Sequence, residues 1–119
     1  MTDQDLLLGI YAAFNRRDID AVLIAMHPEV DWPNGMEGGR VYGHEAVRQY
    51  WQRQWKQINP VVEPQSFHTD PTGAIVVEVH QVIRDLSGSL LAERMVQHVY
   101  RIEDGLIRSM EIRETNQTP

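Results

Sequence analysis

One histidine, His98, lies in the middle of a strand-like segment and is well suited to acid–base chemistry. In VQHVYRIEDG (residues 96–105), alternation places His98 on the same face as Val96 and Tyr100. An imidazole on an apolar face should have its pKa lowered by desolvation. The position predicts either a neutral hydrogen-bond donor or general acid or base, or a core residue bonded to a backbone carbonyl or to Tyr100.

A second histidine, His80, lies in the middle of the preceding strand pattern, VHQV (residues 79–82). A hairpin turn at Ser87-Gly88 would bring this strand beside that of His98. The sequence does not fix the register, and a shift of one residue would turn His80 to the other face. Two expectations therefore stand for His80: a cavity shared with His98, or a place on the surface or at a dimer interface.

Composition excludes several other kinds of chemistry. The sequence contains no cysteine, so disulfides, thiol nucleophiles and thiolate metal sites are excluded. No His-x-His or His-x-x-x-His spacing occurs, and we expect neither a metal nor a cofactor. The net charge of −6 disfavours nucleic acid as a partner. No apolar run approaches the roughly 20 residues that span a bilayer. The N-terminus also lacks a signal-peptide pattern, so we expect a cytoplasmic protein without a membrane partner.

The elements that must position these histidines divide the chain into a helical first half and a strand-rich second half. Helices are predicted from a capping box at Thr2 to about Asn15, after Asp18 as far as Pro28, and from about His44 to Ile58. A short strand is expected near 30–34, followed by a glycine-rich loop. Four strands follow, at about 61–69, 74–85, 89–102 and 106–114. We expect one α+β domain over residues 1–119.

This order of elements, with NRRDID (residues 15–20), GHEAV (43–47) and HVYRIEDG (98–105), resembles the nuclear transport factor 2-like superfamily. More narrowly, it is similar to the SnoaL-like and ketosteroid isomerase-like branch over about residues 4–114. The resemblance implies a cone-shaped α+β barrel, with N-terminal helices packed on a strongly curved antiparallel sheet around a mostly apolar cavity. It also implies a homodimer formed through the outer face of the sheet. Function on such a scaffold depends on the pocket.

The resemblance places three residues at the functional positions of ketosteroid isomerase. Ile10 stands at the oxyanion-binding tyrosine, with Tyr11 one residue away; Asn34 stands at the carboxylate base, and His98 at the protonated aspartate. Asn34 can form hydrogen bonds but cannot take up a proton at neutral pH. Steroid isomerisation is therefore not expected. His98 with His80 is similar to the histidine pair that holds a catalytic water in scytalone dehydratase. His98, His80 and Asn34 are the candidate catalytic residues.

Two other family chemistries find weaker counterparts. SnoaL-like polyketide cyclases carry an acid/base aspartate on the final strand, where Glu111 is the nearest group here. Its neighbours Arg108 and Arg113 favour a surface ladder of ion pairs instead. The Arg-x-Asp pattern of limonene epoxide hydrolase-like members is absent, because Arg94 is not followed by a carboxylate.

The resemblance also assigns five residues to ligand binding in the cavity wall. These are Trp32, Tyr50 and Trp51, with Tyr11 and Met110 close by. Such large side chains would narrow the cavity and favour a small or flat apolar molecule. The leading hypothesis is a cofactor-independent isomerase, cyclase or dehydratase that acts on a small carbonyl-bearing or hydroxylated compound. The alternative is a non-catalytic protein of the same fold that binds a small molecule or serves as a dimerisation scaffold.

Overall fold

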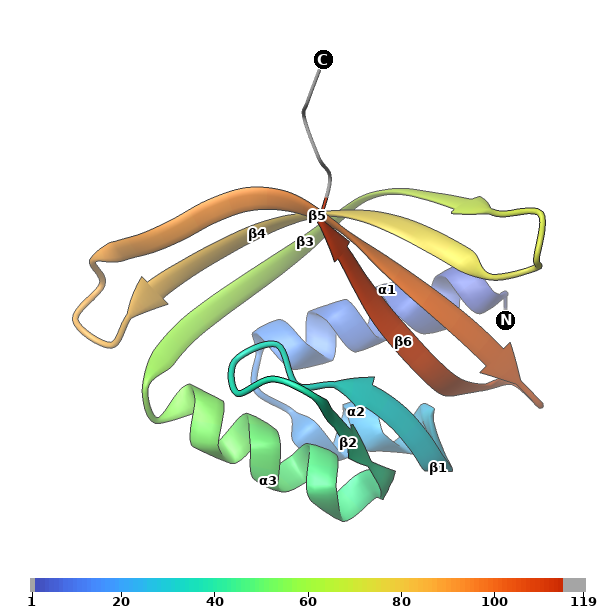
Figure 1. Ribbon diagram of the computed structural model, residues 1–119, viewed down its shortest axis with the longest axis horizontal. Helices are drawn as coiled ribbons and strands as arrows, with labels where there is room; N and C mark the ends of the chain where they lie inside the picture. The colour runs from blue at the N-terminus through green and yellow to red at the C-terminus, as the bar shows by residue number, and fades with distance from the viewer. Residues whose placement is uncertain (1, 115–119) are drawn as a thin grey trace.

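The computed structural model describes residues 2–114 of the chain, which form three helices and a six-stranded sheet (Figure 1). The helices are α1 (Asp3–Asn15), α2 (Ile19–Ile24) and α3 (Gly43–Trp55). The first two strands are β1 (Met26–Pro33) and β2 (Arg40–Tyr42). The four long strands of the second half are β3 (Ile58–Thr69), β4 (Ile75–Asp85), β5 (Leu90–Glu103) and β6 (Leu106–Glu114).

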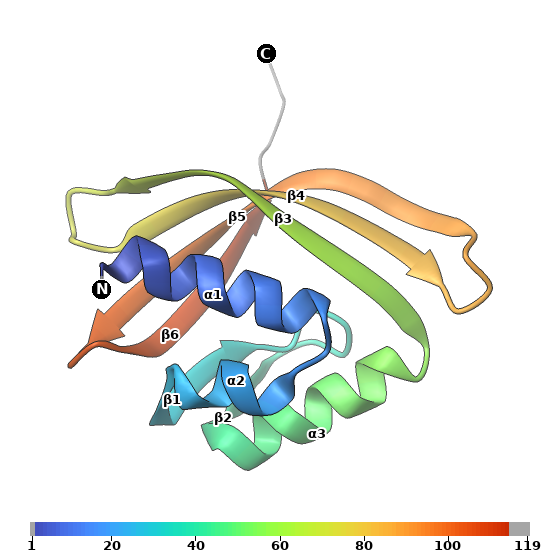
Figure 2. The ribbon, with the colours of Figure 1, turned by 180° about the vertical axis from the view of Figure 1, so that it is seen from behind.

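The strands form one curved sheet in the order β2-β1-β6-β5-β4-β3. β1 runs parallel to β6, and the other neighbours are antiparallel. The sheet does not close, because β2 and β3 remain its two edges. Figures 1 and 2 show the long strands arching over the helices, all of which lie on the concave side. The predicted α+β architecture, with helices on a strongly curved sheet, is confirmed.

Helix α1 is fixed at both ends by side-chain hydrogen bonds. At its start, the predicted capping box forms between Thr2 and Asp5, with bonds of 3.1 and 3.3 Å. At its end, the Asn15 side chain bonds both the N–H and the carbonyl of Val62 on β3, at 3.0 and 2.7 Å. Tyr11 lies one turn before Asn15 on the same side of the helix. The bonds of Asn15 to β3 therefore direct Tyr11 towards the sheet.

The sequence prediction is wrong around the first strand. The apolar spacing places Met26 in the second helix, but α2 ends at Ile24 and Met26 begins β1. The Ile107 N–H of β6 donates to the Ala25 carbonyl at 2.9 Å, and Met26 pairs with Ile107. Pairing with a strand distant in the sequence thus overrides the local helical pattern. Strand β2 lies in the segment predicted as a loop.

The core fills the space between the helices and the concave face of the sheet. Its most deeply buried large side chains include Leu7, Met26, Val77, Tyr100 and Ile107. Helix α3 contributes Val47, Tyr50 and Trp51, which lie at spacings of three or four and therefore share one face. No helix within residues 2–114 is long and apolar enough to cross a membrane.

Candidate active site

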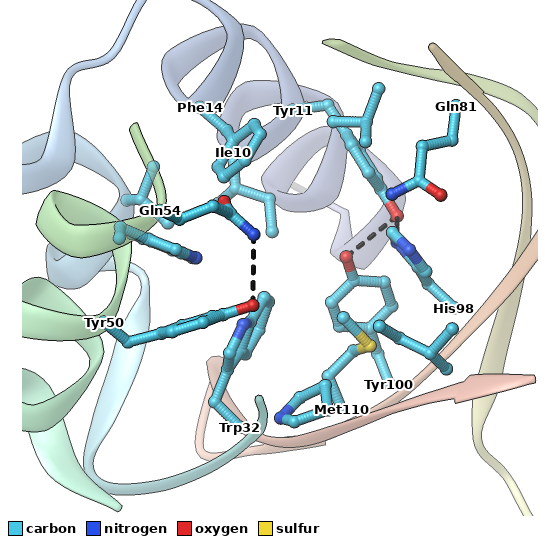
Figure 3. A pocket seen from close by; sticks show the side chains of 15 residues that line it. Ile10, Tyr11, Phe14, Trp32, Tyr50, Gln54, Gln81, His98, Tyr100 and Met110 are labelled. Carbon is cyan, nitrogen blue, oxygen red and sulfur yellow. Dashed lines mark hydrogen bonds between the residues drawn. The ribbon is translucent and has the colours of Figure 1, made fainter. Parts of the chain in front are cut away.

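A small cavity remains between α1, α3 and the concave face of the sheet. Its volume is about 80 Å³, and most of its wall is aromatic or aliphatic. The five residues predicted for the wall all line it: Tyr11, Trp32, Tyr50, Trp51 and Met110 (Figure 3). Ile112 of β6 also lines the cavity and is itself 40% exposed. The cavity is small and largely lined by aromatic side chains.

His98 faces this cavity because of its place in the strand register. It pairs with Val77 of β4 and with Ile112 of β6, and paired residues share a face of the sheet. Val77 belongs to the core, and His98 is only 6% exposed. His98 is therefore an imidazole set among apolar side chains at the wall of the pocket, as the alternation of β5 predicts.

A buried chain of hydrogen bonds joins His98 to two tyrosines. The Tyr100 hydroxyl donates to the Tyr11 hydroxyl at 2.8 Å, and the Tyr11 oxygen lies 2.7 Å from His98 Nδ1. The rings of Tyr11 and His98 stack with centroids 5.8 Å apart. Figure 3 shows the three side chains together on one side of the pocket. The family tyrosine aligns with Ile10, one residue before Tyr11. Tyr11 nevertheless places a tyrosine hydroxyl in the site.

One arrangement of protons pairs every hydroxyl donor along the row formed by Tyr100, Tyr11 and His98. Tyr100 donates to Tyr11, so the Tyr11 proton is free to be donated to His98 Nδ1. The ring proton of neutral His98 then lies on Nε2. No residue within 2–114 forms a hydrogen bond with Nε2. In this arrangement the hydroxyl protons of Tyr100 and Tyr11 both form hydrogen bonds. The Nε2–H of His98 remains available to another molecule.

Burial shifts the proton equilibria of all three groups towards their neutral forms. Burial lowers the pKa of His98 from 6.5 to about 4. It raises the pKa values of Tyr11 and Tyr100 well above the usual value of a phenol. At neutral pH the side chains of Tyr100, Tyr11 and His98 are therefore all uncharged. Each of them can donate a proton in a hydrogen bond.

The chemistry available to this pocket is narrow. No carboxylate, lysine or arginine is among its lining residues within the described part of the chain. A neutral imidazole in a dry site can donate to a carbonyl oxygen and stabilise the negative charge that develops there. With a pKa of about 4, however, His98 is a weak base at neutral pH. Residues 2–114 also contain no group of three side chains that could hold a metal ion.

The sequence matches the model of the SnoaL-like domain over residues 8–110, a span that includes Tyr11, His98 and Tyr100. The chain belongs to the SnoaL-like family. No match to the sequence was found among curated proteins.

Solved structures of SnoaL-like and related folds are similar over nearly the whole chain. An NTF2-like protein of unknown function from Burkholderia pseudomallei is 28% identical, with a TM-score of 0.83, covering 97% of this chain and 92% of that one. TerC, crystallised with polyporic acid, is 27% identical, with a TM-score of 0.82 and coverage of 95% and 91%. An LEH-like epoxide hydrolase from Mycobacterium tuberculosis is 19% identical, with a TM-score of 0.76 and coverage of 93% and 80%. The last similarity supports the fold alone.

His80 does not share the cavity with His98 in this SnoaL-like chain. It pairs with Met95, so it lies one position away from the residues that face inward, Val79 and Gln81. Its Nε2 lies 2.7 Å from a carboxylate oxygen of Glu93 on the outer face. The prediction of a shared histidine pair is therefore wrong, and the surface alternative describes its position.

Asn34 does not line the pocket, although only 7% of its surface is exposed. Its Oδ1 accepts from the Glu37 N–H at 2.8 Å, and its Nδ2 donates to the Glu37 carboxylate at 2.9 Å. Both ends of its amide are therefore used in the turn that follows β1, between residues 34 and 39. The structure thus does not bring Asn34 to the cavity with His98, because local turn bonds occupy its side chain.

Glu111 also lies away from the cavity. It pairs with Val99, which lies on the face opposite His98, and its carboxylate is 4.0 Å from Arg113. The surface ion pair expected from the sequence describes this arrangement.

Sequence reasoning missed two polar residues that line the pocket, Gln54 and Gln81. Gln54 follows Tyr50 by four residues on α3, so the helical repeat places both on one face. That spacing was the available signal for Gln54. Gln81 faces inward because of the register of β4 against β5. This register cannot be read from the sequence.

Proposed function

We propose that this SnoaL-like protein is a cofactor-independent isomerase, cyclase or dehydratase that acts on a small carbonyl-bearing compound. The observation that carries this proposal is the contact of 2.7 Å between Tyr11 and Nδ1 of a neutral histidine in the wall of an apolar cavity. In these reaction classes, negative charge develops on a carbonyl oxygen. The site offers a fixed N–H donor where such charge would be stabilised.

In this proposal His98 Nε2 donates to the carbonyl oxygen of the substrate. Tyr11 holds the imidazole from the other side and keeps the ring proton on Nε2, and Tyr100 in turn fixes Tyr11. A base from solvent, such as a water molecule admitted with the substrate, takes the proton from the carbon next to the carbonyl. As the carbonyl oxygen gains charge, the hydrogen bond from His98 strengthens, which lowers the barrier to forming the enolate. Tyr11 and Tyr100 are thus positioning residues, and His98 is the residue that contacts the reacting atoms.

The similarity to TerC supports a small-molecule ligand. TerC is 27% identical and has been crystallised with polyporic acid. In the present chain, Trp32, Trp51 and Met110 line the pocket, and these side chains favour a flat apolar compound. A volume of about 80 Å³ suits a compound of about one ring, with larger parts extending through the open side.

Hydrogen–deuterium exchange at the carbon next to a carbonyl tests this role without knowledge of the natural substrate. Acetophenone is incubated with the full chain in deuterated buffer, and the loss of its methyl signal is followed by proton NMR. We expect the protein to accelerate exchange and the His98→Ala variant to lose at least about tenfold of that acceleration. His80→Ala, on the outer face, is the matched control and should keep it.

Equal acceleration by wild type and His98→Ala would contradict the proposed role of His98. Binding of acetophenone without any acceleration would favour the second candidate function, a non-catalytic protein that binds a small apolar molecule. That alternative has one specific observation in its favour: the pocket contains no carboxylate among its described lining residues, so a strong base is lacking.

We also propose that the protein forms a homodimer through the outer face of the sheet. On this face Ala74, Val76 and Val99 are already buried within the single chain, whereas Met95, which pairs with His80, is 38% exposed and lies beside polar side chains. Light scattering should give twice the mass of the chain. A monomeric mass at micromolar concentration would contradict the proposal.

A further inference from the structure

The hydroxyl oxygen of Tyr50 is surrounded by hydrogen-bond donors. The Met36 N–H donates to it at 3.2 Å, and Gln54 Nε2 donates to it at 3.0 Å. The Gly35 N–H also interacts with this oxygen as a hydrogen-bond donor. Burial raises the pKa of Tyr50, and the N–H groups of Gly35 and Met36 both lower it. A hydroxyl oxygen has two lone pairs, and both are used by these donors.

With the Gln54 amide in this orientation, the proton of the Tyr50 hydroxyl has no acceptor within the described part of the chain. Burial raises the pKa of Tyr50, so the group stays protonated at neutral pH. Tyr50 is itself 3% exposed and lines the cavity, which leaves the cavity as the place for an acceptor. A buried donor without a partner costs free energy, and its occurrence at a pocket wall indicates a ligand that completes it.

Gln54 holds this oxygen in place at a cost. Its Oε1 is buried and has no hydrogen-bond partner among residues 2–114, while its Nε2 bonds Tyr50. Rotating the amide by half a turn would let Tyr50 donate to Oε1, but the two N–H groups of Nε2 would then be buried without partners. In either orientation at least one hydrogen-bond donor of the Tyr50–Gln54 pair lacks an acceptor among residues 2–114, and in the observed orientation the Tyr50 proton is such a donor.

The Tyr50 hydroxyl and His98 belong to different walls of the same pocket. Figure 3 shows Tyr50 with Gln54 on one side and His98 with Tyr11 and Tyr100 on the other. Ile112 lies directly opposite His98 in the strand register. A Cβ added at Gly35 would lie 3.6 Å from Ile112 Cδ1 and 4.0 Å from the Tyr50 oxygen, so Tyr50 and Ile112 approach the same point.

We propose that the Tyr50 hydroxyl is a second hydrogen-bond donor to the ligand, and that the pocket selects a small, flat, uncharged compound with oxygen atoms at two opposite edges. One oxygen, a carbonyl, accepts from His98, and the other, a hydroxyl or second carbonyl, accepts from Tyr50. The carbonyl end rests on the proposed function. The absence of charged side chains among the described lining residues favours a neutral compound.

Three one-ring probes separate the two ends of the pocket. Para-hydroxyacetophenone carries both oxygen groups, acetophenone lacks the hydroxyl, and para-ethylphenol lacks the carbonyl. Dissociation constants are measured by NMR titration of the full chain. We expect para-hydroxyacetophenone to bind about tenfold more tightly than acetophenone, since one hydrogen bond to a buried donor differs between them.

Substitutions then assign this preference to Tyr50. Tyr50→Phe should bind both ketones equally. Gln54→Met keeps the length of the side chain but removes its hydrogen bonds, and it should reduce the preference for the hydroxylated ketone by releasing the Tyr50 proton to other orientations. Tyr42→Phe, at a residue 65% exposed, is the matched control and should keep the full preference.

Three outcomes overturn the inference: equal binding of the two ketones by the wild type, a preference that survives Tyr50→Phe, or no binding of para-hydroxyacetophenone at millimolar concentration. A different result would count against the carbonyl end alone. If para-ethylphenol binds as tightly as para-hydroxyacetophenone while Tyr50→Phe still removes the hydroxyl preference, the proposed function fails and the role of Tyr50 stands.

Discussion

His98 and His80 stand in similar local sequences on neighbouring strands, yet they lie on opposite faces of one sheet. Each follows or precedes a glutamine and has valines close by. His98 pairs with Val77 and is 6% exposed, whereas the side chain of His80, which pairs with Met95, is 33% exposed. A difference of a single register position therefore separates a buried, uncharged imidazole in a pocket from a histidine beside a surface carboxylate.

The two faces of the sheet also give their polar groups different partners. On the concave face, His98 bonds a buried tyrosine on a helix, in a space lined by aromatic rings. On the outer face, His80 bonds Glu93 of the adjacent strand, where solvent reaches both side chains. Hydrogen bonds in the dry environment are stronger and cost more when they are broken, so substitutions on the two faces should differ in effect.

Truncating the concave face should give the largest difference. Trp51 is 2% exposed and contacts the rings of Phe14, Trp32 and Trp55, so Trp51→Ala should lower the free energy of unfolding by about 3–5 kcal/mol. Leu91→Ala, at a residue 56% exposed on the same strand as His98, should change it by no more than about 0.5 kcal/mol. Urea unfolding measures both. If both variants lost a similar amount of unfolding free energy, the predicted difference between a buried and an exposed residue would be wrong.

The stability of the fold should depend on pH through His98. Its pKa is about 4 in the folded chain and near 6.5 when unfolded, so below pH 6.5 the unfolded chain binds a proton that the folded chain does not. Stability should therefore fall as pH drops from about 6.5 to 4, by about 3 kcal/mol in total, and this contribution should be constant above 6.5. Urea unfolding at several pH values measures the slope. His98→Gln should flatten it and His80→Gln should retain it; a slope unchanged in His98→Gln would assign it to other groups.

Removing one hydroxyl from the buried chain should have an intermediate effect. Tyr11→Phe leaves the Tyr100 hydroxyl and His98 Nδ1 without their partner, which should cost about 1–3 kcal/mol of unfolding free energy. It should also slow the exchange of acetophenone, because the imidazole is no longer oriented. The exposed Tyr42→Phe should change neither value. Full activity in a stable Tyr11→Phe variant would show that Tyr11 does not position His98.

Substitution on the outer face should have the smallest effect. Glu93→Gln removes the charge beside His80, and since solvent reaches both side chains the loss should be less than about 1 kcal/mol. Thermal unfolding at low and high salt gives the value. A loss as large as that of Tyr11→Phe would indicate that the outer face is covered, for example in a dimer.

The sequence predicts those parts of the fold that depend on local patterns. The capping box at Thr2, the aromatic face of α3 and the boundaries of the last four strands follow from periodicity and turn residues, and they agree with the structure to within about three residues. The start of β1 at Met26 was missed, because it depends on pairing with β6, which lies far along the chain. Local spacing carries no information about such a partner.

For the candidate site, too, the sequence predicts the features that depend on local patterns and does not predict those that depend on distant contacts. The inward direction of His98 follows from alternation along one strand, and the aromatic wall follows from the family resemblance. The outward direction of His80 depends on the register between two strands, and the local role of Asn34 depends on the turn that contains Glu37. The hydrogen bond of Tyr11 to His98 joins residues far apart in sequence and needed the docking of α1 on the sheet.

The pKa of the His98 imidazole in the folded protein tests the account most directly. NMR titration of the histidine ring signals, with the His98→Gln variant to assign the resonance, gives this value. A resonance that stays in the neutral form from pH 8 to about pH 5 and titrates near pH 4 agrees with a buried imidazole held by Tyr11. Titration of His98 at or above its ordinary value of 6.5 would contradict a neutral donor in a dry pocket.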